Sequence, residues 1–84
     1  MWYVYIIRCK GDKLYTGITK DLERRLSEHN SGEGARFTRS RLPVKLIYRE
    51  RRPDRSKALK REAEIKNLTR EKKIALIASF EPCQ

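Results

Sequence analysis

The segment Trp2–Cys9 has an apolar or aromatic side chain at nearly every position. Side chains of a β-strand alternate between its two faces, so a strand that is apolar on both faces is expected to be covered on both sides. The chain has 84 residues with which to build this cover, which is room for one domain. We therefore expect residues 1–84 to form a single domain around this strand.

Two further strands are predicted. A turn signal at Lys10–Lys13 joins the first strand to a second at Leu14–Thr19, which gives an antiparallel hairpin. Gly17 interrupts the second strand, and a glycine inside a strand marks a bulge or a place where another group approaches the backbone. Pro43 introduces a third strand at Val44–Glu50. The three strands are expected to form a small antiparallel sheet.

Three helices are predicted from apolar periodicity and capping residues. The first spans Asp21–Asn30, and a basic loop follows at Ala35–Leu42. Asp54 or Ser56 is expected to cap the second helix, and Thr69 the third. The fold class is therefore α+β, a three-stranded antiparallel sheet flanked by three helices in the order ββαβαα. The expected inward positions of the last two helices are Ala58, Leu59, Glu62, Ile65, Ile74, Ile77 and Ala78.

The chain is strongly basic, with 21 Lys and Arg against 11 Asp and Glu and a net charge of +10. Such an excess repels itself, so it usually has a polyanionic partner. Nucleic acid fits this charge best, with an anionic membrane or an acidic protein as alternatives. The basic residues are densest in one segment, which contains Arg36, Arg39, Arg41, Lys45, Arg49, Arg51, Arg52 and Arg55. Such residues bind phosphates without recognising the base sequence. The alternative is that they form a solvated basic surface with no dedicated binding site.

The two cysteines, Cys9 and Cys83, lack the spacing of a zinc site or of a disulfide framework. We expect two free thiols in a reducing cytosol. The apolar N-terminus is too short for a signal peptide, and no apolar run is long enough to cross a bilayer. A cytoplasmic location and no membrane contact are therefore expected.

Tyr5 and Tyr15 lie on neighbouring strands of the hairpin. A connection of three or five residues would place both side chains on one face, whereas two or four residues would separate them unless a bulge intervenes. Two core tyrosines are the plain alternative to a functional pair, since tyrosine is common in strands. If they are buried, their hydroxyl groups still need hydrogen-bond partners.

Arg25 and His29 are one turn apart on the stripe of the first helix that also carries Leu22 and Leu26. An arginine on an inward stripe is costly unless an anion meets it, although its stem can also carry the charge outward. A histidine there can equally serve a structural role. The stripe thus indicates either an anion site or a polar group satisfied within the core.

Glu62 shares the helical register of Ala58, Leu59 and Ile65, so its carboxylate is expected to point toward the sheet. The alternative is a surface ion pair with Lys66, four residues later. An inward carboxylate needs a cation, either a side chain such as Arg25 or a divalent metal with oxygen ligands.

These side chains fit phosphodiester cleavage, which needs a deprotonated nucleophile, a cation on the developing charge and help for the leaving oxygen. A tyrosine or His29 could relay the proton, Arg25 could brace the phosphate, and Glu62 could hold Mg²⁺ or Mn²⁺. The sequence has no Ser/His/Asp or Cys/His arrangement for acyl transfer and no phosphate-binding P-loop. His29 is the only histidine, which excludes a multi-histidine metal site.

The chain resembles the GIY-YIG family of endonucleases, and in particular its small stand-alone bacterial members of the YhbQ-like, UPF0213 type. The resemblance covers nearly the whole chain and depends on the order and spacing of its segments rather than on any one of them. These segments are Tyr3-Val4-Tyr5, Tyr15-Thr16-Gly17-Ile18-Thr19, Asp21–Asn30, Phe37-Thr38-Arg39-Ser40 with Pro43-Val44, and Ala58-Leu59-Lys60-Arg61-Glu62. In the first motif, Tyr3 and Val4 stand where the family has glycine and isoleucine.

The resemblance implies a metal-dependent phosphodiesterase that acts on DNA, with RNA as the alternative, and that uses Mg²⁺ or Mn²⁺. Tyr5, Tyr15, Arg25 and His29 match the positions of the family's site residues, and Glu62 matches its metal-binding glutamate. We expect selection by the structure of the nucleic acid, or by a partner protein, rather than by base sequence. The expected nucleic-acid contacts are Gly17, Lys20, Arg36, Arg39, Arg41 and Lys45.

Two other functions remain open from the sequence. The chain could be a nucleic-acid-binding module that kept the fold without turnover, or a basic adaptor for an acidic protein. Binding that persists without metal would favour the module. Binding to a protein that nucleic acid does not compete away would favour the adaptor.

Overall fold

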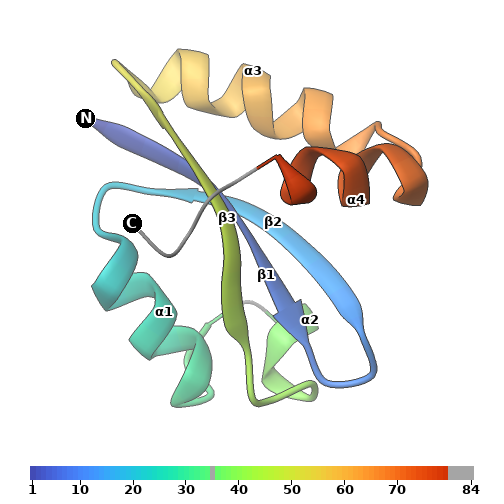
Figure 1. The fold of residues 1–84 in the computed structure, drawn as a ribbon. Helices are drawn as coiled ribbons and strands as arrows, with labels where there is room; N and C mark the ends of the chain where they lie inside the picture. The colour runs from blue at the N-terminus through green and yellow to red at the C-terminus, as the bar shows by residue number, and fades with distance from the viewer. Residues whose placement is uncertain (35, 80–84) are drawn as a thin grey trace.

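The computed structural model describes residues 1–34 and 36–79 (Figure 1). The strands are β1 (Trp2–Cys9), β2 (Lys13–Thr19) and β3 (Lys45–Arg52). The helices are α1 (Leu22–Asn30), α2 (Arg36–Arg39), α3 (Arg55–Lys66) and α4 (Arg70–Ala78). The α+β class and the three-stranded antiparallel sheet predicted from the sequence are confirmed. Among the described residues, no helix has the length and apolarity needed to cross a membrane.

β1 is the middle strand of a sheet with the order β2-β1-β3, and both of its pairings are antiparallel. Its four residues Val4–Ile7 are all buried, because α1 covers one face of the sheet and α3 covers the other (Figure 1). The double cover inferred from the apolar pattern of this segment is thus present.

Each face of the sheet has its own core. On the α3 side, Val4 and Ile6 of β1 pack with Tyr48 of β3 and with Ala58 and Ile65 of α3. On the α1 side, the buried residues are Tyr5, Ile7, Cys9 and Val44, against which Leu22 and Leu26 of α1 pack. Burial raises the pKa of the Cys9 thiol, which remains a free, protonated cysteine. Cys83 lies outside the described residues.

The hairpin between β1 and β2 decides which side chains share a face. Cys9 pairs with Lys13, which leaves a three-residue connection whose Gly11 and Asp12 have φ values of 82° and 61°. Glycine adopts this left-handed conformation without steric cost, and Asp is one of the few other residues that tolerate it. With this connection Tyr15 pairs opposite Ile7, so Tyr15 and Tyr5 lie on the same, α1-facing side of the sheet.

Two predicted helix caps, Asp54 and Thr69, are confirmed by their hydrogen bonds, whereas Asp21, expected as the first residue of its helix, is the cap that precedes α1. Asp21 accepts from the Arg24 backbone N–H at the start of α1, and Asp54 accepts from that of Lys57 at the start of α3. Thr69 likewise caps α4. Each cap satisfies a backbone donor that has no partner within the first turn of a helix.

Three expectations about the helices need correction. Part of the predicted loop is the short helix α2, which packs beside α1. Leu59 is exposed, because α3 approaches the sheet through Ala58 and Ile65, two turns apart, and Leu59 lies farther around the helix. In α4 the inward residues are Leu76 and Ile77, whereas Ile74 is 49% exposed and Ala78 is exposed. The packing direction of a nine-residue helix is set by its neighbours, and its own pattern fits more than one direction.

Candidate active site

Tyr5 lies in the middle of β1, with its ring over Gly17 of β2. A Cβ atom at Gly17 would lie 2.6 Å from the Tyr5 hydroxyl oxygen and 2.8 Å from the ring carbon that carries it. Real Cβ atoms do not approach other atoms so closely, so Gly17 provides the space in which the phenol lies. Of the two interpretations of this strand glycine, close approach is correct. The approaching group is Tyr5, and the nucleic-acid contact expected for Gly17 stays a prediction.

His29, near the end of α1, is fully buried and bonded through both ring nitrogens. Its Nε2 atom is 3.0 Å from the Tyr5 hydroxyl, and its Nδ1 atom is 2.8 Å from Oγ1 of Thr38. The ring of Tyr15 packs edge-on against the imidazole, with 5.4 Å between ring centroids. The structure therefore brings three of the predicted site residues, Tyr5, Tyr15 and His29, into direct contact.

Two residues that help to place His29 were not identified from the sequence. Thr38 of α2 is fully buried, and its hydroxyl bonds the imidazole. Gly34 lies against the ring, because a Cβ atom there would be 2.2 Å from Nδ1 of His29. The segment Phe37-Thr38-Arg39-Ser40 was part of the family resemblance, which was the signal that could have identified Thr38. Nothing local in the sequence indicates the contact made by Gly34.

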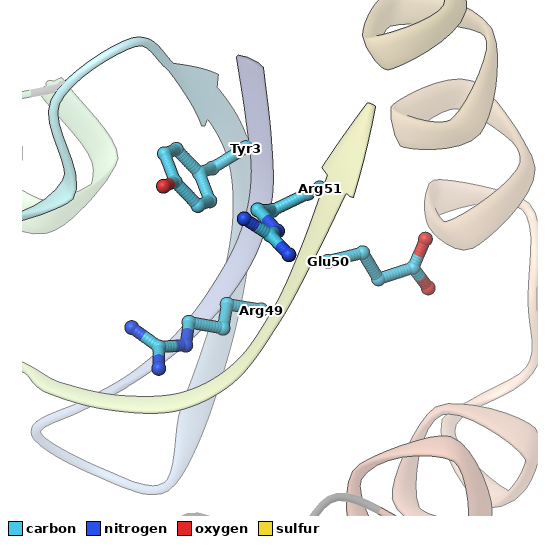
Figure 2. A pocket seen from close by; sticks show the side chains of 4 residues that line it. All are labelled: Tyr3, Arg49, Glu50 and Arg51. Atoms are coloured by element: carbon cyan, nitrogen blue, oxygen red, sulfur yellow. The ribbon is translucent and has the colours of Figure 1, made fainter. Parts of the chain in front are cut away.

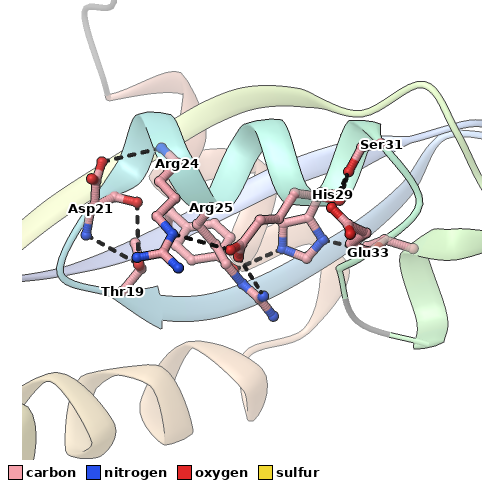
Figure 3. A network of polar contacts seen from close by, with 10 residues as sticks. Thr19, Asp21, Arg24, Arg25, His29, Ser31 and Glu33 are labelled. Atoms are coloured by element: carbon pink, nitrogen blue, oxygen red, sulfur yellow. Dashed lines mark hydrogen bonds and ion pairs between the residues drawn. The ribbon is translucent and has the colours of Figure 1, made fainter.

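Arg25 projects from α1 on the same side as His29 (Figure 3). Its side chain is 31% exposed and its Nη1 atom donates to Glu28 at 3.1 Å. The guanidinium is near enough to Tyr5 to lower the pKa of the phenol, opposing the larger effect of burial. The neighbouring Arg24 also pairs with Glu28, at 3.3 Å, but is 77% exposed. Of these two arginines, only Arg25 reaches the phenol of Tyr5.

Glu62 lies on α3, which packs against β1 and the edge strand β2. Its side chain is 17% exposed, and it forms an ion pair with Lys66 at 3.3 Å. Its negative charge is also among the influences that raise the pKa of Tyr5. The carboxylate is thus mostly sheltered. In the described part of the chain it forms no hydrogen bond or ion pair with Tyr5, Arg25 or His29, and the surface ion pair with Lys66 that the sequence left open is formed.

Burial sets the protonation states of the two central groups. It raises the pKa of Tyr5 to about 12, because the charged phenolate is poorly solvated inside the protein. It lowers the pKa of His29, and the nearby positive charge of Arg25 lowers it further. Near neutral pH the site therefore contains a neutral phenol that is hydrogen-bonded to a neutral imidazole.

This burial predicts a loss of stability on mild acidification. The unfolded chain takes up a proton on His29 near pH 6.5, whereas the folded protein takes it up only at lower pH, so acidification below about pH 6.5 favours unfolding. We expect the free energy of unfolding in urea to fall between pH 7.5 and 5.5, by at most about 1.4 kcal/mol for each pH unit. In His29→Gln this dependence should be absent, and an equally steep decline in that variant would contradict the prediction.

The predicted nucleic-acid contacts are spread over several elements. Lys20 reaches back to the ring of Trp2, with its Nζ atom 5.5 Å from the ring centroid. Arg39 and Lys45 are exposed, and Arg41 is half-buried, with its backbone carbonyl accepting from the Lys10 N–H. The side chain of Arg36 lies outside the described part of the chain.

The residues that could hold a metal ion are few. Within residues 1–34 and 36–79, no group of three or more His, Cys, Asp and Glu side chains is placed to bind one. Glu62 offers a carboxylate, and Mg²⁺ commonly binds through one or two carboxylates while waters and substrate phosphates complete its octahedron. The donor chemistry therefore fits a magnesium or manganese ion shared with a bound phosphate, and it does not fit a cage made of protein ligands.

Known proteins resemble this chain in both sequence and fold. The GIY-YIG catalytic domain family matches residues 1–75. A UPF0213 protein of Staphylococcus saprophyticus is 51% identical over 76 residues, which cover 90% of this chain and 93% of that protein. A UPF0213 protein of Haloquadratum walsbyi is 59% identical over 71 residues, which cover 84% and 80%.

Among solved structures, the solution NMR structure of a UPF0213 protein from Bacillus halodurans matches with a TM-score of 0.63. It shares 40% sequence identity, and the match covers 99% of this chain and 89% of that one. The order of the segments that carry the resemblance agrees with these matches. The chain belongs to the GIY-YIG catalytic domain family, a family of nucleases, and to its UPF0213 group.

Proposed function

We propose that this protein is a divalent-metal-dependent endonuclease that hydrolyses phosphodiester bonds in DNA and selects its substrate by structure rather than by base sequence. The observation that carries the proposal is the hydrogen bond between Tyr5 and the fully buried, neutral His29. A buried phenol that has a proton acceptor beside it suits proton transfer more than it suits packing. Residues 1–84 would act as one catalytic domain in the cytoplasm.

The proton of the attacking water would pass through this pair. With a pKa of about 12, Tyr5 is not a phenolate at neutral pH, so its oxygen gains basicity only if it gives up its own proton as it receives another. Nε2 of His29 is 3.0 Å away and can accept that proton. This assignment requires the tautomer in which Nδ1–H donates to Oγ1 of Thr38, 2.8 Å away. Thr38 then acts as the residue that keeps the imidazole in that tautomer.

Arg25 would stabilise the charge that develops on the phosphate. Its guanidinium is partly exposed and lies beside Tyr5, so a phosphate held by it would lie next to the group that deprotonates the nucleophile. Arginine suits this role because its planar fork matches the oxygens of a phosphate. Glu28 holds the guanidinium from the other side, at 3.1 Å.

Glu62 would hold the metal ion, because it is the sheltered carboxylate whose charge reaches Tyr5. A bound Mg²⁺ or Mn²⁺ would offset negative charge on the phosphate and on the leaving oxygen. In the absence of metal, Lys66 neutralises the carboxylate. Ion pairs of this kind contribute only a few tenths of a kcal/mol, so a divalent ion that binds with the substrate can replace the lysine.

The test is cleavage of a panel of labelled DNAs that contains single-stranded, nicked, branched and fully paired molecules. We expect cutting with Mg²⁺ or Mn²⁺, complete loss in EDTA and recovery when metal is restored, with nicked or branched DNA cut faster than plain duplex. A protein that is folded by circular dichroism yet inert toward every substrate and metal would refute the proposal.

A second function, a nucleic-acid-binding module without turnover, is favoured by one observation. Lys66 already forms an ion pair with the carboxylate of Glu62, so a metal ion would have to displace the lysine to bind there. That module would bind nucleic acid in a salt-sensitive way, in EDTA as well as in Mg²⁺. Its binding would also persist in Glu62→Gln, and no cutting would accompany it.

A further inference from the structure

We propose that Tyr3, Arg49 and Arg51 form a docking surface for a single-stranded segment of the DNA that leads to the candidate active site. We name these three residues the open-end surface. The inference rests on the proposed function for the identity of the substrate. It adds a preference for unpaired DNA and the residues that create it.

The open-end surface lies on the same face of the sheet as Tyr5. Arg51 pairs with Tyr3 across β1 and β3, and Arg49 pairs with Tyr5, so these side chains share one face. Figure 2 shows Tyr3, Arg49 and Arg51 on one side of the strands and Glu50 on the other, toward α3. A hollow of about 320 Å³ is lined by these three residues and by Glu50, whose side chain points to the other side of β3 (Figure 2). A DNA strand held there would lie next to Tyr5, which is two residues from Tyr3 along β1 and whose hydroxyl belongs to the candidate active site.

Because side chains alternate between the two faces of β3, its arginines lie on faces with different charged neighbours. Glu50, on the α3 side, pairs with Arg52 at 2.5 Å and with Arg61 at 2.9 Å, and it also bonds the Tyr48 hydroxyl. On the opposite side, Arg49 and Arg51 are both exposed, and no carboxylate of the described residues forms a salt bridge with either. Two adjacent guanidinium groups without an acidic partner repel each other, and an anion between them relieves that repulsion.

Tyr3 gives this surface its preference for unpaired DNA. Its side chain is half-buried at the edge of the hollow, with the arginines beside it. Single strands bind proteins through aromatic rings that stack with bases and basic groups that hold the phosphates between them. In a duplex each base is already stacked and paired, so its face is not available to Tyr3. One ring beside two guanidinium groups therefore matches a short unpaired segment.

The start of α1 limits the path of this strand. A second hollow of about 240 Å³ continues from Tyr3 and Arg49 to Lys20, Leu22 and the acidic residues Asp21 and Glu23. The Asp21 carboxylate caps α1, whereas Glu23 is exposed and would repel a phosphate. The backbone of a bound strand is therefore expected to follow β3, with its bases turned toward Tyr3.

The test compares affinities in EDTA, where no cutting occurs, for a labelled oligothymidylate of about 12 nucleotides and a duplex of the same length. Tyr3→Leu should weaken oligothymidylate binding about tenfold and duplex binding less than about twofold, whereas Tyr3→Phe should retain wild-type affinity. The double variant Arg49→Gln/Arg51→Gln should weaken both. The plot of the logarithm of single-strand affinity against the logarithm of salt concentration should also become less steep. Its slope should fall by about 0.7 for each phosphate that the variant no longer neutralises.

The matched control is Lys57→Gln/Lys60→Gln, which removes two exposed charges from α3 and should change affinity much less. Equal losses in the two double variants, or unchanged oligothymidylate binding in a folded Tyr3→Leu protein, would overturn the inference. Either result leaves metal-dependent cutting to be judged from the substrate panel. Conversely, the protein could cut no substrate while Tyr3→Leu still weakens single-strand binding. That result would support the docking surface and refute the nuclease proposal.

Discussion

Glu62→Gln is expected to reduce metal-dependent DNA cleavage by about a hundredfold or more. The substitution keeps the size of the side chain and removes the charge that would hold Mg²⁺ or Mn²⁺, and a metal ion supplies several kcal/mol of charge stabilisation in the transition state. The fold should be retained, because the ion pair with Lys66 that this variant removes is worth only a few tenths of a kcal/mol. Cleavage rates at saturating metal and circular dichroism spectra measure the two effects separately.

Lys66→Gln is the control for this experiment. If Glu62 serves only to pair with Lys66, the two variants should behave alike, because each breaks the same ion pair. If Glu62 is a metal ligand, Lys66→Gln should cut at least as well as wild type and should need no more metal, since the competing ammonium group is gone. Matching activities in the two variants would remove Glu62 from the site.

Arg25→Ala is expected to lower the cleavage rate by about a hundredfold to a thousandfold, the range seen when one preorganised stabiliser of transition-state charge is removed. Arg25 lies beside Tyr5 and remains partly exposed, so it can meet both the phosphate and the phenol. Rates measured in a single turnover with excess enzyme report this loss without interference from product release.

Arg24→Ala provides an unusually close comparison. Arg24 is the preceding residue of the same helix, has the same charge and pairs with the same carboxylate of Glu28, but it is 77% exposed. Its removal should change the rate by less than about threefold, because exposed ion pairs contribute little. Similar losses in Arg24→Ala and Arg25→Ala would mean that bulk charge, rather than the position beside Tyr5, explains the effect.

The elements of the fold could be predicted because their signals are local. Each signal involves residues that are neighbours in the chain: the apolar run of Trp2–Cys9, the turn at Lys10–Lys13, and the caps Asp54 and Thr69. The length of the turn connection was the exception. It determines whether Tyr5 and Tyr15 share a face, and the sequence allowed more than one length.

The surroundings of His29 could not be predicted, because they come from separate parts of the chain. Thr38 reaches the imidazole from α2, a segment that was expected to be a loop, and Gly34 meets the ring only because the chain folds back over the end of α1. Helical periodicity placed His29 on an inward stripe correctly, but it carries no information about which groups lie opposite. The contact between Tyr5 and Gly17 is similar, since a strand glycine indicates a close approach without naming the group that approaches.

The positive charge of this molecule is unevenly available, because of the alternation along β3. On the α3 side, Glu50 forms ion pairs with Arg52 and Arg61. On the opposite side, Arg49 and Arg51 form no salt bridge with a carboxylate of the described residues. The net charge of +10 thus includes two guanidinium groups, on the face of the sheet that carries Tyr5, whose charge can act on a polyanion. Salt should weaken the attraction of these two groups for DNA, because it shortens the range over which their charges act.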